Sequence, residues 1–110
     1  MVNSPDGARA FGTLADFIRH KSTLNPRLRE MAIIQVGYLT KSEYEYTHHV
    51  RLGTEQFGVT EDDINSITLE TNGNKTSLPK LEKTILRATR DMVTNLKITD
   101  TDFEFLKGYL

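Results

Sequence analysis

Apolar side chains in this chain recur every three or four residues, which is the spacing of one face of an α-helix. The clearest run lies towards the C-terminus, where this spacing connects Leu81, Ile85, Ala88, Met92 and Leu96. Alternation of apolar and polar residues with a period of two, which is typical of a half-buried strand, is almost absent. The pattern therefore predicts an all-α fold.

Capping residues divide the chain into about six helices. Asn25 precedes Pro26, a combination typical of a helix start, and the helix that it opens would run to about Leu39. Ser42 and Gly58 would bound the next helix, because the first is a good capping residue and the second a good terminator. The other predicted starts are at Thr13, Thr60, the Leu78-Pro79 pair and Thr99.

The length of 110 residues fits one domain. Residues 1–12 contain one proline, two glycines and little apolar pattern, so we expect a flexible N-terminal arm followed by a single helical domain over residues 13–110. A net charge of −1 provides no electrostatic footprint for nucleic acid, and no apolar run is long enough for a membrane span. The N-terminus does not resemble a signal peptide, so we expect a cytoplasmic protein.

The chain contains no cysteine, which excludes disulfides, thiolate nucleophiles and cysteine-bound zinc. Its three histidines are too few to indicate a structural metal site by themselves. We therefore expect neither a metal nor a cofactor.

The stretch KSEYEYTHH near the middle of the chain holds the densest group of proton-handling side chains. On a helix that starts there, Ser42, Glu45 and His49 fall on one narrow stripe. The preceding helix carries Glu30 on an apolar face, and the short link favours an antiparallel pair that brings Glu30 towards Glu45 and His49. An imidazole between two carboxylates is able to hold and release a proton near neutral pH without a metal.

The same residues also permit a purely structural interpretation. Ser42 and Glu45 have the spacing of a capping box, in which the cap contributes about 1 kcal/mol. Glu45 and His49 are four residues apart, as in an ordinary pair on a helix surface. Arg27 is a potential partner of Glu30. Spacing alone leaves both interpretations open.

The segment LNPRLREMAIIQVGYLTKSEYEYTHHVRLGTEQFGVTEDDINSI, residues 24–67, resembles the carboxymuconolactone decarboxylase family, whose superfamily includes the alkyl hydroperoxidase D proteins. Weaker similarity continues through LEKTILRATRDMV. The shared order is a proline-led helix with a glutamate, an S-E-Y-E turn, a histidine one turn later and a G-V-T-E-D-D cap. The resemblance implies an alkyl hydroperoxidase D-like helical bundle that assembles as a homo-oligomer, commonly a trimer or a hexamer.

The peroxidase branch of that superfamily has a glutamate, two cysteines separated by two residues, and a histidine. In this sequence those positions fall on Glu30, Ser42, Glu45 and His49. Because both cysteines are replaced, thiol-dependent peroxide reduction is disfavoured. The glutamate–histidine proton machinery remains, as in the decarboxylase branch.

The resemblance implies a cofactor-free carboxy-lyase that acts on a small carboxylated lactone or related organic acid. His49 would donate the proton, and Glu45 and Glu30 would orient its ring. Arg51 is a weaker candidate for binding the substrate carboxylate because it lies on another face of its helix. A non-catalytic helical oligomer that binds a small acidic ligand is the alternative. The predicted substrate-binding residues are Ser42, Tyr46 and Arg27.

Overall fold

The computed structural model describes residues 25–95 and 99–107, and these residues form five helices joined by short connections. The predicted all-α fold is confirmed over these ranges, which contain no strand. The expected arm over residues 1–12 and the helix expected after Thr13 lie outside the described residues. The helices are α2 (Pro26–Leu39), α3 (Glu43–Gln56), α4 (Glu61–Thr71), α5 (Lys80–Asn95) and α6 (Asp100–Lys107).

The helices begin where the capping residues predict. The side chain of Asn25 accepts a hydrogen bond from the backbone N–H of Leu28 at 2.8 Å. Thr60 and Asp63 form a complete capping box at the start of α4, and Thr99 caps α6. These caps satisfy backbone N–H groups that have no partner inside their own helix, so the starts depend on residues within one turn.

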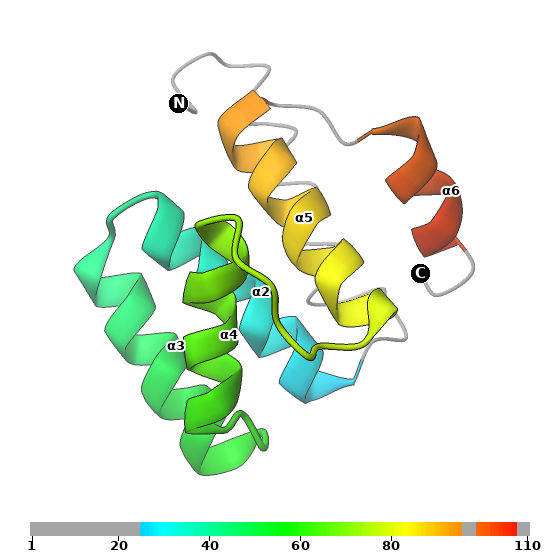
Figure 1. Cartoon of the computed structure of the whole chain (residues 1–110). Coiled ribbons are helices and arrows are strands. Elements are labelled where there is room, and N and C mark those ends of the chain that lie inside the picture. The colour runs from blue at the N-terminus through cyan, green and yellow to red at the C-terminus, as the bar shows by residue number, and fades with distance from the viewer. Residues whose placement is uncertain (1–24, 96–98, 108–110) are drawn as a thin grey trace.

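α2 is the central helix and packs against α3, α4 and α5. Figure 1 shows α3 at one edge of the molecule and α6 at the other, beside α5. Each large apolar side chain buried here contributes about 1.5–3 kcal/mol. The largest fully buried apolar side chains are Leu28, Met31, Ile34, Ile67 and Leu86.

Among the described helices, none is long and apolar enough to cross a bilayer.

The turn between α2 and α3 reverses the chain within three residues. Lys41 adopts a left-handed conformation with φ 58°, and the next backbone N–H, that of Ser42, donates to the carbonyl of Gly37 at 3.0 Å. This closes the end of α2 and begins α3 immediately. α3 therefore folds back along α2, and side chains late in α3 meet residues early in α2.

Two glycines lie at the contact between α2 and α3. A Cβ atom on Gly37 would lie 2.8 Å from the backbone nitrogen of Tyr46. A Cβ atom on Gly53 would lie 2.9 Å from Cγ2 of Val59 and 3.4 Å from Cβ of Glu30. At Gly37 the Cβ atom would meet backbone, so this glycine sets how closely α3 approaches α2, whereas at Gly53 the closest neighbour is the side chain of Val59.

Candidate active site

Glu30 is a buried carboxylate in the middle of α2, with 3% of its surface exposed. A buried carboxylate is costly unless other groups donate hydrogen bonds to it. Oε1 of Glu30 lies 2.7 Å from Nδ1 of His49, and Oε2 lies 3.3 Å from Nε of Arg29. Each carboxylate oxygen of Glu30 therefore has its own nitrogen partner.

His49 lies between a buried and an exposed carboxylate. Its Nδ1 atom faces Glu30, and its Nε2 atom lies 3.4 Å from Oε2 of Glu45. The exposed fraction of the side chain rises from 4% for Glu30 to 12% for His49 and 48% for Glu45. The predicted meeting of these residues is confirmed. We call Glu30, His49 and Glu45 the carboxylate–imidazole chain, because they connect the interior to the solvent.

The partner on Nδ1 determines what the other ring nitrogen can do. A carboxylate accepts hydrogen bonds, so an ionised Glu30 requires a hydrogen on Nδ1 of His49. In the neutral ring, Nε2 is then the free base, and in the imidazolium it is the second acid. Because Nε2 points towards the exposed Glu45, it is the ring nitrogen on the solvent side of His49.

The capping-box interpretation of Ser42 and Glu45 holds only in part. Oγ of Ser42 accepts a hydrogen bond from the backbone N–H of Glu45 at 3.3 Å. In a complete capping box the backbone N–H of Ser42 would donate to the side chain of Glu45, but here this N–H donates to the carbonyl of Gly37. The side chain of Glu45 pairs with His49 instead. The cap therefore orients the start of α3 and leaves the Glu45 carboxylate for the imidazole.

Arg27 does not pair with Glu30, so that structural alternative is wrong. Its Nε atom donates to Asp63 at 2.8 Å, and its Nη1 atom donates to Glu82 at 2.9 Å. These hydrogen bonds raise the pKa of Arg27 above its ordinary value. Burial raises the pKa of Asp63, but the hydrogen bonds from Arg27 and from the Thr60 backbone outweigh it and lower that pKa overall. Substrate binding by Arg27 stays a prediction, and it now requires a substrate that displaces one of these carboxylates.

Tyr46 is half-buried on the α2 side of α3. It packs against the hydrophobic core, and its ring centroid lies 6.2 Å from that of Tyr38. Ser42 is half-buried and acts as the helix cap. Both residues thus have structural contacts, and their predicted contacts with a substrate stay predictions.

Sequence reasoning missed Arg29 and the rings around His49. Arg29 is the immediate neighbour of Glu30 in sequence, and adjacent helical residues point about 100° apart, so no spacing signal indicates the pair. Tyr44 is 73% exposed and stacks on His48 with centroids 5.7 Å apart. The His48 ring meets His49 edge-on at 5.0 Å. His48 is therefore half-buried between two rings.

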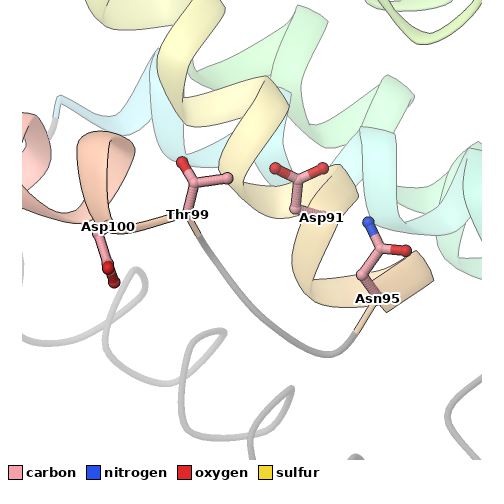
Figure 2. A pocket seen from close by; sticks show the side chains of 4 residues that line it. All are labelled: Asp91, Asn95, Thr99 and Asp100. Atoms are coloured by element: carbon pink, nitrogen blue, oxygen red, sulfur yellow. The ribbon is translucent and has the colours of Figure 1, made fainter.

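A cavity of about 430 Å³ lies where α5 ends and α6 begins, and it is separate from the carboxylate–imidazole chain. Figure 2 shows its lining side chains, which carry two carboxylates, an amide and a hydroxyl. None of them contacts the carboxylate–imidazole chain. Within the described ranges, no three histidine or acidic side chains are arranged to hold a metal ion. The lining residues are Asp91, Asn95, Thr99 and Asp100.

The family assignment agrees with this geometry. Residues 5–71 match the model of the carboxymuconolactone decarboxylase family. The match covers more than half of the 110 residues, so the chain belongs to the carboxymuconolactone decarboxylase family. It includes all of α2, α3 and α4, and therefore every member of the carboxylate–imidazole chain. No curated protein and no solved structure matched the chain.

Proposed function

We propose that this protein is a decarboxylase of small carboxylated lactones or related organic acids, in which His49 delivers the proton. The single observation that carries the proposal is the position of His49, between buried Glu30 and exposed Glu45. General acid catalysis by a positioned side chain contributes typically about 10²–10⁴-fold to a rate. Membership of the carboxymuconolactone decarboxylase family supports this choice of reaction class.

The reaction has two steps at the substrate. The bond between the carboxylate and the adjacent carbon breaks, carbon dioxide leaves, and the bonding electron pair remains as an enolate-like carbanion. The imidazolium form of His49 then gives its Nε2 proton to that carbon. Glu30 accepts a hydrogen bond from Nδ1–H throughout, which keeps the ring oriented and stabilises its positive charge before transfer.

Glu45 completes the cycle in this proposal. After the transfer, the neutral ring needs one proton from the solvent. Glu45 is about half exposed and has an oxygen 3.4 Å from Nε2, so its carboxyl group can carry a proton from water to the ring. Ser42, Tyr46 and Arg27 remain proposed substrate contacts, and assembly into a homo-oligomeric trimer or hexamer remains a proposal.

The test compares two adjacent histidines. Purified protein is incubated with carboxymuconolactone and a panel of small carboxylated lactones in deuterated water, and carbon dioxide release and deuterium uptake are measured. We expect one deuterium on the carbon that lost the carboxylate. His49→Gln should reduce turnover by at least about 10²-fold, whereas the matched control His48→Gln should retain most of it.

The alternative is a non-catalytic helical oligomer that binds a small acidic ligand. The observation in its favour is that Ser42 and Tyr46 already have structural roles as a cap and a core contact. Calorimetric binding of the same acids without carbon dioxide release by the wild-type protein would support it. An undiminished rate in His49→Gln would overturn the assignment of His49 as the proton donor.

A further inference from the structure

Glu30 is oriented from two sides. His49 approaches Oε1 at 2.7 Å from α3, and Arg29 approaches Oε2 at 3.3 Å from the preceding position of α2. A carboxylate held by two nitrogen donors cannot rotate without losing both hydrogen bonds. The Arg29 contact therefore helps to decide which oxygen faces the imidazole, and in what direction.

Arg29 is itself held by an aromatic ring from the far end of α3. Its guanidinium carbon lies 4.9 Å from the centroid of Phe57, within the range of a cation–π interaction. Phe57 is the C-cap of α3, and its backbone N–H donates to Gly53 at 3.1 Å. The Arg29 side chain is 24% exposed, so solvent only partly screens its charge. Arg29 thus connects the start of α2 with the end of α3 beside Glu30.

We propose that Arg29 is a positioning residue, which orients Glu30 so that the neutral His49 ring keeps its hydrogen on Nδ1 and presents Nε2 as the reactive nitrogen. This inference rests on the proposed function of the same site. It differs from the predicted role of Arg27, whose guanidinium is already paired with Asp63 and Glu82. Arg29 acts through Glu30 and does not need to touch the substrate.

The tautomer of His49 can be measured without any substrate. Nitrogen-15 spectra of the full chain, recorded where the ring is neutral, distinguish a hydrogen on Nδ1 from one on Nε2. In the wild type we expect the Nδ1–H form to dominate. In Arg29→Gln the ratio of Nδ1–H to Nε2–H should fall, because Glu30 is then free to turn away from Nδ1 and the hydrogen bond that favours the Nδ1–H form weakens. Arg29→Lys should recover part of that ratio.

Two further variants make the test specific. Arg51→Gln removes the same charge from an exposed position of α3 and should leave the tautomer ratio unchanged. Phe57→Leu removes the ring under the guanidinium and should shift the ratio in the same direction as Arg29→Gln, but by less. If circular dichroism shows that Arg29→Gln does not fold, the tautomer ratio of Phe57→Leu tests the positioning role in its place.

The outcomes separate the inference from the proposed function. An unchanged ratio in Arg29→Gln, or in Phe57→Leu if the first variant is unfolded, would overturn the positioning role. An equal change of the tautomer ratio in Arg51→Gln would also overturn the positioning role, because the loss of any positive charge would then be enough to shift the tautomer. A raised KM with unchanged kcat in Arg29→Gln would show substrate binding instead. A shifted tautomer in a protein whose wild type has no turnover would leave the positioning role standing and remove the decarboxylase.

Discussion

The imidazole of His49 on α3 lies 2.7 Å from the carboxylate of Glu30 on α2, and this contact joins the two helices through a group that is almost fully buried. Nineteen residues separate the partners in sequence. Gly37 lets the backbones of α2 and α3 approach closely enough for the contact. The geometry of this pair leaves Nε2 as the ring nitrogen that faces away from the core.

Replacing Glu30 with glutamine should lower turnover more than it lowers stability. The amide keeps the shape of the side chain, but it removes the charge that stabilises an imidazolium and places an N–H beside one of the two nitrogen donors. We expect turnover to fall by about 10²-fold or more and the free energy of unfolding to fall by about 1–3 kcal/mol. Urea unfolding and carbon dioxide release measure the two effects. The exposed control Glu55→Gln should change neither, and wild-type turnover in Glu30→Gln would contradict the orienting role.

Replacing Glu45 with glutamine should slow the return of the proton to His49. The amide cannot carry a proton from solvent to Nε2, so turnover should fall by about tenfold or more at low buffer concentration. Small acidic buffers such as acetate or imidazole should restore part of the rate as their concentration rises, because they deliver the proton directly. Plots of kcat against buffer concentration test this. A rate that does not respond to buffer would rule out the relay.

Alanine at position 37 should separate α2 from α3. The new Cβ would lie 2.8 Å from a backbone nitrogen of α3, and backbone cannot rotate away. We expect a loss of about 1–3 kcal/mol of unfolding free energy and a weakened contact between Glu30 and His49. Gly53→Ala is the matched comparison, because its nearest atom belongs to the side chain of Val59 and can move. Thermal unfolding of both variants should show the larger loss for Gly37→Ala.

Acid should unfold this protein through two buried carboxylates. The hydrogen bond from Arg87 lowers the pKa of Asp102 below 3.8, although burial opposes it, and Asp63 is lowered in the same net direction by Arg27. A carboxylate whose folded pKa is depressed stabilises the fold fully above its unfolded pKa and loses that contribution as pH falls through the folded value. Stability should therefore be level at neutral pH and fall below about pH 4–5.

Asparagine variants isolate that effect. Asp63→Asn and Asp102→Asn should each be less stable than the wild type at pH 7, with the difference shrinking as pH falls below about 4. Melting temperatures measured from pH 7 to pH 2.5 give the curves. A difference that stays constant over this range would show that these ion pairs contribute no pH dependence.

The mass of the protein in solution tests the proposed assembly. Gly53 is the only fully buried residue of α3, and the exposed Tyr44 stands beside the imidazole pair. Light scattering coupled to size-exclusion chromatography should give about three or six times the chain mass of 12.5 kDa. The charged substitution Tyr44→Glu should reduce that mass if α3 lies in the contact. A wild-type mass of one chain would remove the proposal.

Local features of the structure were predictable from the sequence. The starts of α2, α3, α4 and α6 follow their capping residues, because a cap satisfies N–H groups only two or three positions away. The antiparallel α2–α3 pair and the meeting of Glu30, Glu45 and His49 also followed from helix period and a short link. Each of these depends on spacing along one helix or across one turn.

The tertiary structure alone decided the partners of the two arginines early in α2. Arg27 pairs with carboxylates 36 and 55 residues away, rather than with Glu30 one turn along its own helix. Glu30 is instead held by its neighbour Arg29, whose guanidinium lies over a ring from the end of α3. Long side chains reach many partners, and the burial of each carboxylate by distant helices determines which partner it requires. Sequence spacing carries no record of that burial, so the caps and the meeting of Glu30 with His49 could be predicted, whereas the partners of Arg27 and Arg29 could not.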